Sequence, residues 1–149
     1  MLRLSRQKGL AAVEATLVLP IMLLLLLAIG EFGRMLYEYN TLTKAVRAGA
    51  RTASVSPNAG NFDVTLVQGK TKNMILYGQE TVGTKTVLPG LKAEDITITP
   101  TMIGDDTYVE IHVSYDWQPI FGETFNTFFG NSISLNFPLQ TSMTMRALL

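Results

Sequence analysis

The chain has 149 residues, of which 47% are hydrophobic and 16% are charged, and its formal net charge at pH 7 is zero. This length allows one modest folded domain together with one long appendage. The chain has no cysteine, which excludes a disulfide framework and thiolate chemistry. No basic run follows Lys8, so we expect no nucleic-acid partner.

The N-terminal end of the chain combines a basic leader with an apolar segment. Residues 1–9 include Arg3, Arg6 and Lys8 and no acid, and residues 10–30 carry one charge, Glu14. A membrane-spanning helix needs about 20 apolar residues, so residues 10–30 are predicted to be the transmembrane half of a long helix. Because positive charges precede the span, the N-terminus is expected in the cytoplasm, with the rest of the chain outside the inner membrane.

Residues 31–55 are predicted to continue this helix as an amphipathic extension. Apolar and small residues recur here at alternating spacings of three and four, which places them on one stripe of a helix: Phe32, Met35, Tyr39, Leu42, Val46, Gly49 and Ala53. The charged residues are expected off this stripe, at Glu31, Arg34, Glu38, Lys44, Arg47 and Arg51, and Arg34 and Glu38 are close enough to pair. The small residues near its end suit packing either on the protein's own domain or on neighbouring subunits.

Residues 61–149 are predicted to form a small extracytoplasmic α+β domain. The Pro- and Gly-containing residues 56–60 end the long helix. Asn61 is the expected N-cap of a second helix that runs to about Gly78. The fold class expected for the whole chain is therefore α+β, a long helix followed by a small helix and a sheet.

The remainder of this domain alternates apolar and polar residues, which indicates half-buried strands. The alternation starts at Ile96, recurs from Val109 to Trp117 after a turn at residues 104–106, and recurs from Ile133 to Met143. Strands in succession favour an antiparallel meander. Pro138 has no amide donor, so its strand is expected at an edge or at a bulge. The aromatic residues between the last two strands either close the core or form an exposed patch: Trp117, Phe121, Phe125, Phe128 and Phe129.

The segment RQKGLAAVE, from Arg6 to Glu14, resembles the processing site of type IV prepilins. The resemblance implies that a prepilin peptidase cuts between Gly9 and Leu10, and that Glu14 meets the new amine of a neighbouring subunit. A charged side chain inside a membrane span costs about 2.5–3.5 kcal/mol unless it is paired, so its presence calls for a partner. The alternative is that Glu14 snorkels at the membrane surface and that Gly9 is incidental.

Three further segments are similar to the TadE family: GLAAVEATLVLP from Gly9 to Pro20, EFGR from Glu31 to Arg34, and AVRAGARTA from Ala45 to Ala53. In this last segment the motif residues are Arg47, Gly49, Ala50 and Arg51. Ala15 departs from the aromatic residue that often follows the acid in such proteins. The resemblance implies a non-enzymatic minor pilin or pseudopilin of a tight-adherence (Flp-type) pilus or a related secretion apparatus. Its implied partners are the prepilin peptidase, other pilin-like subunits and the inner-membrane assembly platform, and the subunit could enter a surface pilus.

Pro20 lies in the middle of the predicted span. It cannot donate a hydrogen bond to the carbonyl of Thr16, so it is expected to bend or loosen the helix there. Either it is a flexible point that serves extraction of the subunit into a filament, or it is a tolerated membrane proline.

The sequence offers no constellation that would support catalysis. His112 is the one histidine, and neither a nucleophile elbow nor a phosphate-binding glycine loop is present, so we expect no cofactor and no bound metal. Two alternatives to a processed pilin remain: a binding domain secreted after a cut near Ala28 or Gly30, and a permanently anchored single-pass sensor or adhesion domain. The mature N-terminus distinguishes them.

Overall fold

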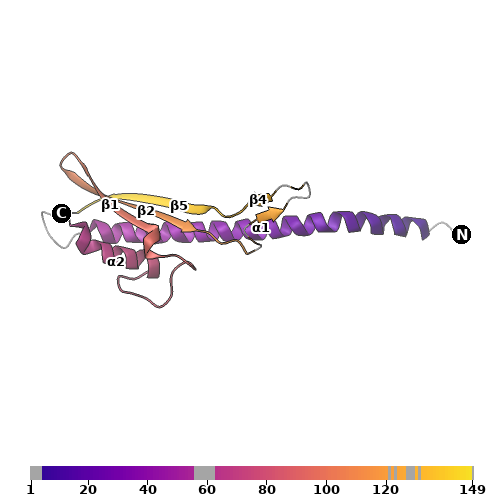
Figure 1. The fold of residues 1–149 in the computed structure, drawn as a ribbon, viewed down its shortest axis with the longest axis horizontal. Coiled ribbons are helices and arrows are strands. Elements are labelled where there is room, and N and C mark those ends of the chain that lie inside the picture. The colour runs from indigo at the N-terminus through magenta and orange to yellow at the C-terminus, as the bar shows by residue number, and fades with distance from the viewer. Residues whose placement is uncertain are drawn as a thin grey trace. The chain divides into compact units, whose positions relative to one another are not determined.

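The computed structural model describes residues 5–55, 63–120, 122, 124–126, 130 and 132–148, and it has an α+β fold (Figure 1). The predicted long helix is confirmed as α1, Ser5–Ser54. The helix begins at Ser5, inside the predicted leader of residues 1–9, so the backbone of Gly9 is helical. The chain divides into two compact units, Met1–Met35 and Leu36–Leu149, so the boundary falls within α1.

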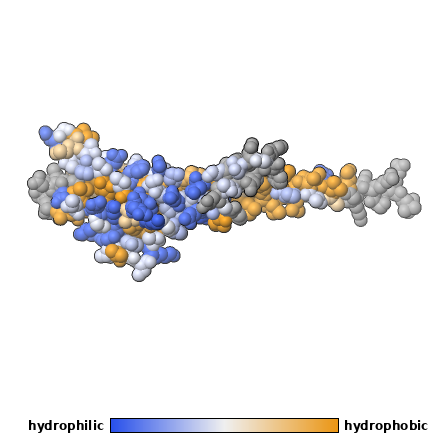
Figure 2. Space-filling view, viewed as in Figure 1, coloured by the Kyte–Doolittle hydropathy of each residue, from blue (hydrophilic) through white to orange (hydrophobic). Residues whose placement is uncertain are grey.

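The first unit consists of the N-terminal part of α1. From Leu10 to Gly30 its side chains are exposed or half-buried on every face. Figure 2 shows hydrophobic residues gathered along this part of the helix. By length and composition, α1 from Leu10 onward is able to cross a membrane, which fits a membrane anchor.

The second helix is α2, Val64–Tyr77. Its N-cap is Asp63 rather than the expected Asn61, which lies outside the described residues: Asp63 Oδ1 accepts a hydrogen bond from the Thr65 backbone N–H at 2.9 Å. At the other end Gly78, in the left-handed conformation with φ 73°, donates its N–H to Met74 O. Both ends are therefore closed by groups that the local sequence provides.

The predicted antiparallel sheet is confirmed, with the strand order β1-β2-β5. β1 is Ile96–Ile103, β2 is Asp106–Asp116 and β5 is Pro138–Arg146, and a short 3₁₀ helix η1, Ala93–Asp95, leads into β1. Ile111 in the central strand lies opposite Ile98 on one side and Met143 on the other. β5 is an edge strand that begins at Pro138, as the missing amide donor predicted.

The single strand expected from Ile133 to Met143 is wrong, because it is broken at residues 135–137. Its first part is β4, Ser132–Ser134, which pairs with β3, Thr124–Asn126, in a separate two-stranded antiparallel sheet. Phe137 in the break contacts Trp117, with ring centroids 5.5 Å apart. Trp117 is buried, as expected for the closing of the core; residues 121 and 127–129 and the side chain of Phe125 lie outside the described structure.

The core of the second unit lies between α1, α2 and the inner face of the sheet. Fully buried residues come from all three, and they include Leu42, Val46, Ala50, Ile75, Val109, Ile111 and Val113. The predicted stripe on α1 is correct from Leu42 onward but wrong before it, because Phe32 and Tyr39 are exposed while Glu31 and Glu38 are buried. Each of these two acids has a polar partner, as a buried carboxylate requires.

Candidate processing and assembly sites on the long helix

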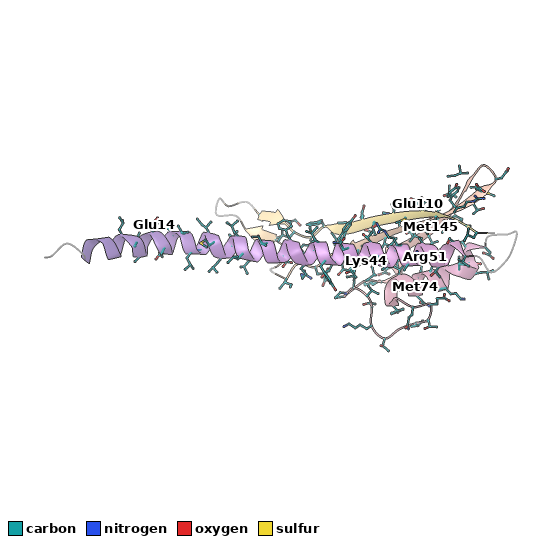
Figure 3. The ribbon with its side chains drawn as sticks, turned by 180° about the vertical axis from the view of Figure 1, so that it is seen from behind. Glu14, Lys44, Arg51, Met74, Glu110 and Met145 are labelled. Carbon is teal, nitrogen blue, oxygen red and sulfur yellow. The ribbon has the colours of Figure 1, made fainter. Side chains whose placement is uncertain are left out.

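Gly9, Leu10 and Glu14 lie on the first turns of α1. The Leu10 side chain is 73% exposed, and Glu14 is exposed as well (Figure 3). Positions four apart lie on one face of a helix, about 6 Å apart along its axis, so Glu14 lies on the face of Leu10. Among the residues that the structure describes, Glu14 makes no hydrogen bond or ion pair within the chain.

Pro20 lies inside α1, where its ring nitrogen leaves the Thr16 carbonyl without the usual helical donor. The Thr16 hydroxyl donates to Ala12 O at 2.8 Å, so it does not replace that donor. The helix therefore has a locally weakened hydrogen-bond ladder shortly after Glu14. The backbone stays helical through Pro20.

The four motif residues near the end of α1 divide between its two faces. Gly49 and Ala50 are buried, whereas Arg47 and Arg51 are exposed (Figure 3 labels Arg51). A Cβ placed on Gly49 would lie 2.4 Å from Cγ1 and 2.7 Å from Cδ1 of Ile75 on α2. Glycine at this position therefore permits the close approach of the two helices.

The small residues around this motif pack within the protein's own domain. Of the two expected packing surfaces, the domain itself and neighbouring subunits, the structure shows the first. Ala45, Ala50 and Ala53 are buried with Gly49, whereas Ala48 is exposed. Lys44, Arg47 and Arg51 form the exposed side of the same helical segment, and none of them has an ion-pair partner within the described chain.

Two polar contacts on α1, one part-buried and one buried, were missed by the sequence prediction. The guanidinium of Arg34 pairs with Glu31 at 3.0 Å, where a pair with Glu38 was expected. Glu38 instead lies 3.3 Å from the hydroxyl of Tyr115, which also donates to Pro89 O at 2.8 Å. The sequence did hold one indication of the second contact. Tyr115 alternates in phase with the buried Val113, so its side chain could be expected on the inward face of the strand.

The described residues contain no group of three histidine, aspartate or glutamate side chains close enough to hold a metal ion. His112 is exposed on the outer face of β2. The chemically distinctive groups of this structure are therefore those of the long helix: a lone carboxylate, a proline and a glycine-mediated helix contact.

Comparison with known families gives a match that lies within α1. Residues 9–51 match the family described as TadE-like protein, which confirms the resemblance seen in the sequence over this segment. The match begins at Gly9 and includes Glu14, Pro20 and the motif around Gly49. No curated protein and no solved structure matches the chain.

Proposed function

We propose that this protein is a pilin-like structural subunit that a prepilin peptidase trims and that takes part in the biogenesis of a tight-adherence pilus or a related secretion apparatus. The observation that carries the proposal is the TadE-like match at residues 9–51, which coincides with a helix apolar enough to cross a membrane. The match favours a structural role in a pilus system over catalysis. The finer assignments below rest on the chemistry of individual residues.

The proposed cut lies between Gly9 and Leu10. Cleavage leaves the apolar helix with a free α-amino group at Leu10, on the helical face that also carries Glu14. The proposed topology places the nine-residue leader in the cytoplasm, because its cations precede the span. In this structure Gly9 is helical, so a peptidase that binds extended chain must first unwind the turn around it. A glycine lowers the cost of that unwinding, because it is a poor helix former.

Glu14 is proposed as the assembly residue. A carboxylate within the bilayer is costly when it is unpaired, and Glu14 has no partner within the described chain. The amine that processing creates on a neighbouring subunit has the charge that would neutralise it. Pairing of the two groups would remove the cost of an unpaired charge in the bilayer, and it would therefore favour the assembled subunits over separate subunits in the membrane.

The mature N-terminus in native membranes tests the processing step. N-terminal sequencing and intact mass should give a chain that starts at Leu10. A start at Met1 would indicate a permanently anchored domain, and a start near Glu31 would indicate a secreted one. Gly9→Val should block the cut, whereas Gly30→Ala, at a glycine with no atom within 4 Å of an added Cβ, should leave it unchanged.

Glu14→Ala tests the assembly step in the same membranes. The variant should insert and be processed normally but should no longer enter the assembled apparatus. Val13→Ala, one residue earlier on the same exposed helix, is the matched control and should assemble normally. Normal assembly of Glu14→Ala would refute the pairing role and would leave the processing result intact.

A further inference from the structure

The exposed side of α1 in the second unit carries a row of cations. Lys44, Arg47 and Arg51 recur at spacings of three and four, so they lie on one stripe of the helix, which we name the basic ridge. All three are exposed, and none has an ion-pair partner within the described chain. No exposed residue from Leu36 to Val55 is acidic. Because like charges at these spacings repel one another, an acid facing the ridge would be stabilising.

The outer face of the sheet, which points away from α1, has the opposite charge along its central strand. Glu110 and Asp116 of β2 are exposed on this face, and neither has an ion-pair partner within the described chain. The residues opposite Glu110 on the neighbouring strands are Thr99 and Thr144, both uncharged. The one lysine or arginine of the three strands, Arg146, already pairs with Asp106 at 2.6 Å.

The basic ridge and the outer face lie on opposite sides of the second unit, because α1 buries its other side against the inner face of the sheet. Figure 3 labels Lys44 and Arg51 of the ridge and Glu110 of the outer face. One chain therefore carries both halves of a contact between opposite charges. Contacts within the unit show which residues of the two surfaces lie at the same height along α1.

The first of these contacts is between Glu38 and Tyr115, whose carboxylate and hydroxyl oxygens lie 3.3 Å apart. Each has a neighbour in the sequence that faces away from the core. Tyr37, beside Glu38, is 71% exposed, and Asp116, beside Tyr115, is exposed on the outer face. Tyr37 and Asp116 are therefore at the same height.

The second contact lies at the end of α1, where Leu148 N–H donates to Ser54 O at 2.7 Å. The β2–β5 register, continued to this residue, places Leu148 opposite Asp106. Arg47 lies about 10 Å along the helix from Ser54, and Glu110 lies about 14 Å along β2 from Asp106. Arg47 and Glu110 are therefore at the same height, within the reach of an arginine side chain.

We infer that the basic ridge of one copy packs on the outer face of a second copy of this chain, with Arg47 against Glu110 and Tyr37 against Asp116. A sideways displacement of the second copy, without a shift along α1, forms both pairs, because each pair is at one height within a copy. Contact of two ridges, or of two outer faces, would oppose like charges. The contact is therefore head to tail, and it can be repeated from copy to copy.

This inference deepens the proposed function and rests on it. An exposed ion pair contributes little to binding between molecules that are free in solution. Anchoring in one membrane raises the effective concentration of the copies and makes weak contacts effective. The head-to-tail contact is therefore expected between anchored copies, and it is tested in native membranes.

Paired cysteines in the full-length protein test the contact, because the chain has no cysteine of its own. Ala48→Cys lies beside Arg47 on the exposed side of α1, and Thr144→Cys lies opposite Glu110 on the outer face. With a short bis-maleimide, the double variant should give a ladder of dimers, trimers and longer chains, whereas each single variant should remain monomeric. A monomeric double variant, efficient dimers of a single variant, or adducts only with a different protein would overturn the inference.

Charge reversal tests the ion pair within this contact. Arg47→Glu and Glu110→Arg, each added to the double-cysteine chain, should lower the yield of the ladder several-fold, and the two together should restore it. Lys85→Glu, the same charge change at an exposed lysine outside the ridge, is the matched control and should leave the yield unchanged. An equal loss in the control, or no recovery when the two reversals are combined, would overturn the inference.

Two further measurements separate the contact from the fold and from the proposed function. Arg47 and Glu110 are exposed, so their variants should keep the unfolding temperature of the parent chain. If Arg47→Glu lowers it, Arg47→Gln, which removes the charge without reversing it, takes its place and should still reduce the ladder. If neither variant reduces the ladder while Glu14→Ala does not assemble, the head-to-tail inference fails and the proposed function stands.

Discussion

Tyr115 on β2 places its hydroxyl 3.3 Å from Oε2 of Glu38 on α1, although 77 residues separate the two in the sequence. The same hydroxyl donates to Pro89 O at 2.8 Å. One side chain thus connects the helix, the central strand and the loop that precedes β1. The contact holds a carboxylate in the interior, where it needs polar partners.

Tyr115→Phe removes this hydroxyl and leaves a buried carboxylate and a carbonyl with one partner fewer. The free energy of unfolding should fall by about 1–3 kcal/mol, the range for the loss of hydrogen bonds to neutral and charged acceptors. Urea unfolding of the full chain in detergent micelles measures the change. Tyr108→Phe, at a half-buried tyrosine of the same strand, should change stability by less than about 0.5 kcal/mol. Equal losses in both variants would contradict the structural role of the Tyr115 hydroxyl.

Gly49→Ala should destabilise the contact between α1 and α2. Its Cβ would lie 2.4 Å from Cγ1 of Ile75, so the isoleucine or the helix must move, at a cost of about 1–3 kcal/mol. Gly69→Ala on α2, with no atom within 4 Å of the added Cβ, should instead stabilise the helix by about 1 kcal/mol. Thermal unfolding measures both changes. Combining Gly49→Ala with Ile75→Ala should cost less than the sum of the single changes, and strict additivity would show that the close contact is not the cause.

Asp63 should make the stability of α2 dependent on acid pH. Hydrogen bonds from the Thr65 hydroxyl and from the Thr65 backbone N–H lower the pKa of Asp63 below its ordinary value of 3.8. A pKa that is lower in the folded state contributes stability above the unfolded value, and this contribution is lost as the pH falls through the folded pKa. Asp63→Ala should therefore be less stable than the parent chain at neutral pH, with a difference that shrinks below about pH 4. Asp63→Asn, which caps without ionising, should lose this pH dependence in acid titrations followed by circular dichroism.

Pro20→Ala tests which of two roles the proline has. An alanine N–H would restore the bond to the Thr16 carbonyl, and an interior proline costs a helix about 3 kcal/mol or more, so amide exchange around residues 16–20 should slow. Hydrogen exchange of the chain in micelles measures this effect. If flexibility at Pro20 serves assembly, the variant should assemble less than Val18→Ala; equal assembly of the two would identify Pro20 as a tolerated membrane proline.

The long helix and the inner face of the sheet were predictable from the sequence because each depends on a repeated pattern. The apolar run from Ala15 to Gly30 and the spacing from Leu42 to Ala53 predicted most of α1, and the alternation from Val109 to Tyr115 predicted β2. The pattern failed at Glu38 and Tyr39, where the acid faces the core and the tyrosine is 40% exposed. The hydroxyl of Tyr115, supplied from a distant strand, contributes a polar contact to that buried acid, and no local pattern contains this information.

The candidate site was predictable in part. The residues around Gly9 and Glu14 stand out locally, because they lie where a basic leader meets an apolar helix. The role of Gly49 became specific only when the structure placed Ile75 against it. The pairing of β5 with β2 also needed the structure, since the alternation of Pro138 to Arg146 does not reveal on which side β2 would pair.

The end of α1 is completed by a much later part of the chain, because Leu148 N–H donates to Ser54 O at 2.7 Å. During synthesis the helix precedes this partner by most of the length of the domain, and β2 likewise waits for β5. Such long-range closures slow folding compared with local contacts. The growing polypeptide therefore carries a long helix before its sheet can form, and the fold of the second unit is reached only after most of that unit has been synthesised.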